Sequence, residues 1–108
     1  EIKDASISYS DFNGWGERLA PFKDLLNNAW RTRGIGDFWS HMLVAEGAVD
    51  VAAEPSLAIW DMAALDIIVR EAGGRFTSVA GVDGSLGGSG LSTNSVIHQE
   101  IVGKLNGR

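Results

Sequence analysis

Residues 58–74, AIWDMAALDIIVREAGG, restrict the possible folds of this chain more than any other segment. Apolar residues occupy nearly every position of a helical pattern, so we expect a helix that is buried on most of its sides. Gly73 and Gly74 follow the last apolar residues and are typical of a helix end. Because a helix of this kind needs apolar partners around it, the chain is expected to fold in packed layers.

Strands and helices are predicted to alternate along the rest of the chain. Period-two alternation or a short apolar or extended run predicts strands at residues 5–10, 31–36, 48–54, 75–79 and 91–95. Apolar residues three and four positions apart predict helices at residues 21–30, 38–46 and 96–105. This order predicts one α/β domain over residues 1–108, in which helices flank a layered sheet.

Charge and composition exclude several kinds of function. The net charge at pH 7 is −5 and the 9 Lys and Arg residues form no dense cluster, so nucleic-acid binding is disfavoured. The absence of cysteine excludes a disulfide framework, a thiolate zinc site and a thiol nucleophile. The apolar stretches are too short and too often broken by charge to cross a bilayer. We expect a cytoplasmic protein that binds neither nucleic acid nor membranes.

Asp61 interrupts the apolar segment where its helix is expected to begin. An aspartate in the first turn is favoured by the helix dipole and accepts hydrogen bonds from free backbone N–H groups. The same position suits a phosphate site, because helix N-termini bind anions and a neighbouring carboxylate holds Mg²⁺. The residues alone leave both interpretations open. Asp66, by contrast, is expected to pair with Arg70 one helical turn later.

The sequence WDMAALDIIVREAGG (residues 60–74) resembles the C-terminal signature of the inositol monophosphatase family. The match consists of Trp-Asp, small residues, an apolar run and Glu-Ala-Gly-Gly. LVAEGAVDVAAE and LSTNS are similar to two strands of the family. Within the family, RGIGDFW (residues 33–39) is most similar to the histidinol-phosphate phosphatases of actinobacterial type. The resemblance covers nearly the whole chain but only the C-terminal half of a family member.

This resemblance implies half of the αβαβα sandwich of a Mg²⁺-dependent phosphomonoesterase, in which Asp61 is a metal ligand. The family's other ligands lie in a Glu-Glu pair and an Asp-Pro-x-Asp-Gly-Thr segment, and this chain contains neither. The water-activating group of the family also lies upstream. Because the chain starts without methionine and close to a predicted strand, we expect an inactive piece that lacks its N-terminal, metal-binding half. A homodimer is implied for the whole enzyme.

Three residues besides Asp61 are implied to face a phosphate ester substrate. Arg33 precedes a glycine turn, where a guanidinium binds phosphate in a bidentate manner; the alternative is a solvated basic residue. Asp37 either caps the helix after it or faces the ammonium or imidazole group of histidinol. Glu54 ends a predicted strand, at the edge where α/β folds build their sites. In relatives this glutamate contacts substrate hydroxyls, and here we expect it to bind the amino group.

The substrate that the resemblance implies is L-histidinol phosphate, hydrolysed to histidinol and phosphate in histidine biosynthesis. Inositol-1-phosphate or a related sugar phosphate is the alternative within the same class. A non-catalytic interaction module that keeps the fold is the alternative from another class. The remaining features predict ordinary roles: structural or surface positions for His41 and for His98, whose helix is expected at the surface, core or interface positions for the four tryptophans, and a flexible loop for residues 81–90.

Overall fold

The computed structural model describes residues 1–34 and 37–107, with the backbone alone at residues 37, 38 and 59. Within them, one sheet contains the strands β1 (Ser6–Tyr9), β2 (Arg31–Gly34), β3 (Val51–Glu54), β4 (Arg75–Thr77) and β5 (Gly90–Thr93). The α-helices are α1 (Leu19–Asn28), α2 (Asp37–Ala45), α3 (Ile59–Glu71) and α4 (His98–Leu105). The predicted α/β class is confirmed.

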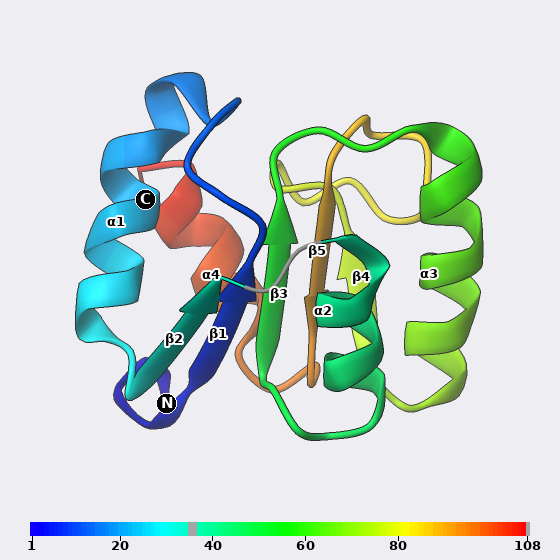
Figure 1. Ribbon diagram of the computed structural model, residues 1–108, viewed down its shortest axis with the longest axis horizontal. Coiled ribbons are helices and arrows are strands. Elements are labelled where there is room, and N and C mark those ends of the chain that lie inside the picture. The colour runs from blue at the N-terminus through cyan, green and yellow to red at the C-terminus, as the bar shows by residue number, and fades with distance from the viewer. Residues whose placement is uncertain (35–36, 108) are drawn as a thin grey trace.

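The strand order of the sheet brings the ends of β1 and β3 side by side. The order is β2-β1-β3-β5-β4; β2, β1 and β3 are parallel, and β5 runs antiparallel to both of its neighbours. After β1 the chain crosses through α1 to β2, whereas after β3 it continues through α3 toward β4 on the other side (Figure 1). The carboxyl ends of β1 and β3 therefore form a topological switch point, where open α/β sheets usually bind their ligands.

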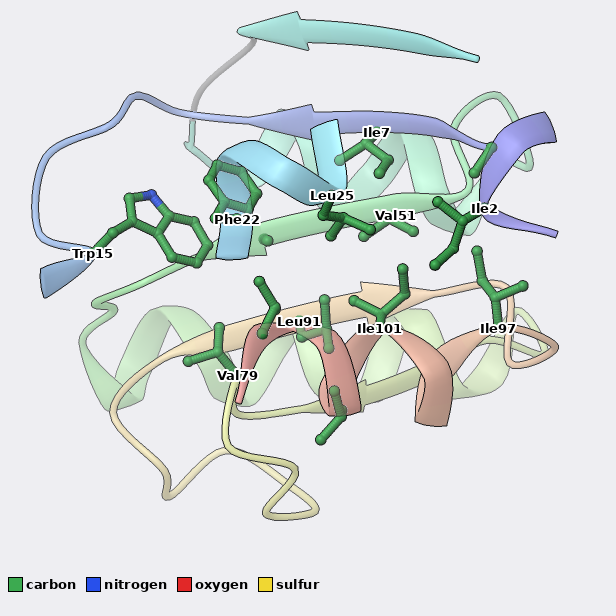
Figure 2. Close-up of a cluster of buried hydrophobic side chains, with 14 residues drawn as sticks. Ile2, Ile7, Trp15, Phe22, Leu25, Val51, Val79, Leu91, Ile97 and Ile101 are labelled. Atoms are coloured by element: carbon green, nitrogen blue, oxygen red, sulfur yellow. The ribbon is translucent and has the colours of Figure 1, made fainter. Parts of the chain in front are cut away.

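Helices cover both faces of the sheet (Figure 1). On one face, α1 and α4 enclose an apolar cluster in which Phe22 and Ile101 meet Ile7 and Val51 of the strands (Figure 2). On the other face lie α2 and α3, and α3 packs on Phe76 of β4. Every residue of β3 is buried, because a central strand of a sheet with two covered faces has no solvent side.

The predicted elements form in the predicted order, with differences at their ends. The strand expected over residues 48–54 begins only at Val51, because Gly47, with a φ of 84°, continues the turn after α2. Asp50 then accepts a hydrogen bond from the backbone N–H of Ser6 with its side chain, at 2.7 Å. Capping of the next helix was one of the two roles expected for Asp37, but α2 begins at Asp37 itself.

The prediction that the α3 helix is buried on most of its sides is wrong. Trp60, Ile67 and Ile68 are 76%, 56% and 43% exposed and form the outer side of α3. The inner side of the helix packs through Met62 and Leu65 into the cluster with β4. An apolar pattern indicates that a face tends to be covered but not by which segment, and no described part of this chain covers the outer side.

The backbone at the end of α3 requires glycine at two successive positions. Gly73 has a φ of 91°, a conformation that favours glycine after a helix. Gly74 lies against β5, so that a Cβ added there would be 2.6 Å from the carbonyl oxygen of Thr93. The predicted termination of the helix by these two residues is confirmed.

Candidate functional site

The four residues that the sequence singles out lie near the carboxyl ends of two parallel strands or in the helices that follow them. Arg33 lies in β2, and Asp37 begins the helix that comes next. Glu54 is the last residue of β3, and Asp61 lies in the first turn of α3. Because β2 and β3 run parallel on either side of β1, their carboxyl ends open on the same edge of the sheet (Figure 1). The backbone therefore brings these four positions to one edge.

Glu54 is the buried carboxylate at this edge. The residue is only 5% exposed, and its Oε1 accepts a hydrogen bond from the hydroxyl of Ser10. Ser10 follows β1 directly, and the register that sets Tyr9 opposite Ala53 places Ser10 beside Glu54. Ser10 is not predictable as a site residue, because nothing in its local sequence pattern distinguishes it from other serines.

Asp61 is an exposed carboxylate at the N-terminus of α3. The residue at the N-cap is Ala58, whose side chain has no hydrogen-bond acceptor. Within the described part of the chain, the Asp61 carboxylate makes no hydrogen bond or ion pair, so no contact supports the interpretation that it caps its own helix. The exposed carboxylate is therefore accessible to a cation, and it lies at the end of the helix where the dipole favours an anion.

Arg33 and Asp37 lie on the β2 side of this edge. Arg33 is exposed, and its Nη1 donates to the carbonyl oxygen of Thr32 at 2.8 Å. A guanidinium has five N–H donors, so this bond leaves most of its capacity to bind an anion. The side chain of Asp37 falls outside the described residues, and the predicted substrate contact there remains a prediction.

Asp66 and Arg70 form the predicted ion pair on α3. The Arg70 Nε donates to Oδ1 of Asp66 at 2.8 Å. The Asp66 side chain is largely buried while that of Arg70 is largely exposed, so the bond satisfies a carboxylate that faces the sheet. Asp66 therefore has a structural partner and does not compete with Asp61 for a role in the site.

His98 is a buried core residue, so the structural role expected for it is confirmed, whereas the surface position that was the alternative is wrong. Its Nε2 and Nδ1 lie 2.8 Å from the hydroxyl oxygens of Thr77 and Thr93. The Thr77 hydroxyl already donates its proton to the carbonyl oxygen of Ser78, so Nε2 carries the imidazole hydrogen and Nδ1 accepts from Thr93. The pKa of His98 is lowered to about 4, chiefly by burial and in addition by the charge of Arg75, while the charge of Asp83 opposes the change.

His41 is the second buried histidine, and its structural role on α2 agrees with the prediction. Its Nδ1 lies 2.6 Å from the hydroxyl of Ser92 on β5, which ties the helix to the sheet. Its Nε2 has no hydrogen-bond partner among the described residues. Burial lowers the pKa of His41 to about 4, so this side chain is neutral at pH 7.

Among the described residues, no three His, Asp or Glu side chains come together in a way that would hold a metal ion. Asp61 and Glu54 are therefore separate carboxylates rather than members of a complete cluster within this chain. None of the helices in the described ranges is long and apolar enough to span a membrane.

Comparison with known proteins identifies the family. The model of the inositol monophosphatase family matches residues 6–107. This chain belongs to the inositol monophosphatase family. It is similar to the histidinol-phosphatase of Mycobacterium tuberculosis, with 52% identity over 98% of this chain and 42% of the relative. The histidinol-phosphatase of Streptomyces coelicolor is 51% identical over 99% of this chain and 41% of the relative.

Solved structures of the family share the fold. The structure of inositol monophosphatase II from Staphylococcus aureus superposes with a TM-score of 0.85 and 25% identity, over 100% of this chain and 42% of that one. The chain thus spans about two fifths of the length of the curated relatives and of this structure. The resemblance seen in the sequence is confirmed, while the roles of Arg33, Asp37, Glu54 and Asp61 stay predictions.

Proposed function

We propose that this chain is the C-terminal part of a Mg²⁺-dependent phosphomonoesterase that hydrolyses L-histidinol phosphate to histidinol and phosphate. The observation that carries the proposal is the 52% identity, over 98% of this chain, to a protein named histidinol-phosphatase. Because the match spans 42% of that relative, the reaction is assigned to a longer protein and not to residues 1–108 alone. The proposed role is a step of histidine biosynthesis in the cytoplasm.

Asp61 suits the metal ion that this reaction would use. Mg²⁺ prefers carboxylate oxygens, needs only one or two protein carboxylates and keeps several waters, so a single exposed aspartate is a sufficient contribution from this chain. When bound, Mg²⁺ polarises the phosphoryl oxygens and stabilises the charge that develops on the leaving oxygen. Asp61 would hold the ion on the leaving-group side. The other ligands and the group that activates water are assigned to the N-terminal half.

Arg33, Asp37 and Glu54 are proposed to bind the substrate. The Arg33 guanidinium would pair with the phosphate group, since planar N–H donors match phosphate oxygens. Histidinol carries an ammonium and an imidazole group, and carboxylates at positions 37 and 54 would favour such a cation over an uncharged polyol. In this assignment the two carboxylates decide which ester is accepted, and Asp61 is common to every substrate of the class.

The outer side of α3 is proposed to pack against the N-terminal half, and the complete enzyme is proposed to be a homodimer. Three large apolar side chains, Trp60, Ile67 and Ile68, are exposed together on one side of a helix. Contiguous apolar patches of this kind usually mark an interface. The curated relatives have more than half of their length outside the matched region, which is enough for a segment that covers this side.

The test measures Mg²⁺-dependent phosphate release from L-histidinol phosphate and from inositol-1-phosphate. The protein is this chain joined to the upstream region that the curated relatives carry. Asp61→Asn is expected to lower kcat/KM by about 100-fold or more on either ester, since the ion loses a charged ligand. Glu71→Gln, at the other end of α3, removes an equivalent exposed carboxylate as the control and should leave both rates unchanged.

Each result separates the alternatives. Release from histidinol phosphate, lost in Asp61→Asn and kept in Glu71→Gln, supports the proposed reaction and the role of Asp61. A preference for the inositol ester would keep the phosphatase chemistry and replace the substrate. No release from either ester would refute the enzymatic function and leave a non-catalytic module with the family fold.

Asp37→Ala tests the recognition of the substrate cation. The variant is expected to lower kcat/KM for histidinol phosphate by about 10-fold or more and for inositol-1-phosphate by less than about threefold, because only the first ester offers a cation to the carboxylate. Equal losses on the two esters would contradict recognition of the ammonium or imidazole group by Asp37.

A further inference from the structure

We propose that Ser10 is a positioning residue, which holds the Glu54 carboxylate in the orientation that recognises the cationic part of the substrate. The inference rests on the proposed function, because it takes Glu54 as a substrate contact. Ser10 acts through Glu54 and is not itself assigned any contact with the reacting phosphate. The observation behind it is the hydrogen bond from the Ser10 hydroxyl to Oε1 of Glu54.

The pairing of β1 with β3 fixes the positions of both residues. The two strands are parallel, and Ser8 and Tyr9 lie opposite Ala52 and Ala53. Continuing this register by one residue places Ser10 beside Glu54, although the two are 44 positions apart in the sequence. The contact therefore lies between the carboxyl ends of the two strands that form the switch point, where a ligand is expected.

Ser10 and Glu54 point to the face of the sheet that α2 and α3 cover. Two residues earlier on each strand, the Ser8 hydroxyl lies 2.8 Å from that of Ser40 on α2, and Ala52 packs with Val44 of the same helix. Side chains along a strand alternate between the two faces, so positions two residues apart share a face. The hydrogen bond therefore lies on the face of the sheet that α3 covers, and α3 carries Asp61 in its first turn.

A hydroxyl donor gives Glu54 what a buried carboxylate needs. An ionised carboxylate taken out of water is costly unless hydrogen bonds replace its hydration, and a glutamate side chain has several rotamers to choose among. The Ser10 hydroxyl supplies a charge-assisted hydrogen bond and fixes one carboxylate oxygen. A carboxylate accepts about four hydrogen bonds, so this contact does not exhaust its capacity to accept one from an ammonium group.

The experiment compares Ser10→Ala and Ser10→Thr in this chain joined to the upstream region of its relatives. For Ser10→Ala, KM for L-histidinol phosphate is expected to rise about 10-fold while kcat changes by less than about twofold, because ground-state binding of the cation is weakened. KM for inositol-1-phosphate, which has no cation, is expected to change by less than about threefold. Ser10→Thr keeps the hydroxyl and is expected to restore KM for histidinol phosphate.

Ser8→Ala is the matched control, since Ser8 lies two residues before Ser10, on the same face of the sheet, and its hydroxyl lies 2.8 Å from that of Ser40 on α2. If the hydroxyls of Ser8 and Ser10 serve only the packing of the sheet, Ser8→Ala and Ser10→Ala will change the ratio of the two KM values alike. If the alanine variant does not fold, Ser10→Cys replaces it in the same KM measurements, because cysteine is almost isosteric with serine and its thiol is a weak hydrogen-bond donor. Its KM for histidinol phosphate is expected to shift in the same direction as that of Ser10→Ala.

The outcomes distinguish this inference from the function on which it rests. An unmodified protein that is inactive on histidinol phosphate, or that prefers the inositol ester, overturns the proposed function and the role of Ser10 with it. An active protein in which Ser10→Ala leaves the KM ratio unchanged, or in which Ser10→Thr does not recover it, overturns the role of Ser10 alone. A selective rise in KM with recovery by threonine supports it.

Discussion

Acidification from pH 7 to pH 5 is expected to destabilise this domain through two buried histidines. His41 and His98 are both 0% exposed, and their pKa values are lowered from 6.5 to about 4. Protonation of His98 at Nδ1 would set an N–H against the Thr93 hydroxyl, which now donates to that nitrogen. Protonation of His41 would bury an N–H at Nε2, for which the described residues offer no acceptor.

The magnitude follows from the difference between folded and unfolded pKa values. Below pH 6.5 the unfolded chain binds protons that the folded chain excludes, so the stability present above pH 6.5 is lost as the pH falls toward 4. A pKa lowered from 6.5 to about 4 corresponds to a loss of about 3 kcal/mol in the free energy of unfolding per histidine, once the histidine is fully protonated. At pH 5 the free energy of unfolding is lower by about 2 kcal/mol for each histidine and by about 4 kcal/mol for both. The total free energy of unfolding of a typical protein is about 5–15 kcal/mol.

Urea unfolding followed by circular dichroism at pH 7 and at pH 5 measures this loss. The range stops at pH 5 because side-chain carboxyl groups ordinarily titrate near pH 4. His41→Gln and His98→Asn each remove one titrating group, so each variant should lose about half as much stability between the two pH values as the unmodified chain. If either variant loses as much as the unmodified chain, or if that chain loses less than about 1 kcal/mol, the reasoning is refuted.

Two further predictions concern packing. Gly74→Ala is expected to lower the free energy of unfolding by about 2 kcal/mol or more, because its Cβ would lie 2.6 Å from the Thr93 carbonyl oxygen; a change below about 0.5 kcal/mol in urea unfolding would contradict this. Residues 1–108 on their own are expected to self-associate through the outer side of α3, and Ile68→Glu should shift them toward monomer in sedimentation velocity. A strictly monomeric unmodified chain would argue against a docking role for that side.

The sequence predicts the fold well because most of the elements carry their own local signals. Glycines after α2 and α3 mark real helix ends, and the short apolar run before Glu54 forms a central strand. The outer side of α3 could not be predicted, since an apolar residue has the same pattern whether its partner lies in this chain or in another segment. The same reasoning explains why Trp60 is exposed within this chain and not in its core; the interface position, which was the other expectation, stays a prediction.

Only some residues of the candidate site could be predicted from the sequence. Glu54 and Asp61 stand out because each ends or begins an apolar element with a carboxylate. Ser10 becomes significant only through the register of β1 with β3, and a register between segments so far apart has no local signature. His98 was expected on a surface helix because histidine counts as polar; it is buried because Thr77 and Thr93 satisfy both of its ring nitrogens.

The place of β5 in the sheet has a consequence for synthesis on the ribosome. β5 lies between β3 and β4 although both precede it in the chain, so β4 has no strand to pair with until residues 90–93 have been made. During that interval α3, which packs on β4 as well as on α2, lacks part of the cover of its inner apolar side, while its outer side is exposed. Pairing between distant segments is slow and leaves apolar surface open to other molecules. Nascent chains that stop before residue 90 should therefore bind chaperones, and release should follow the emergence of β5 from the exit tunnel.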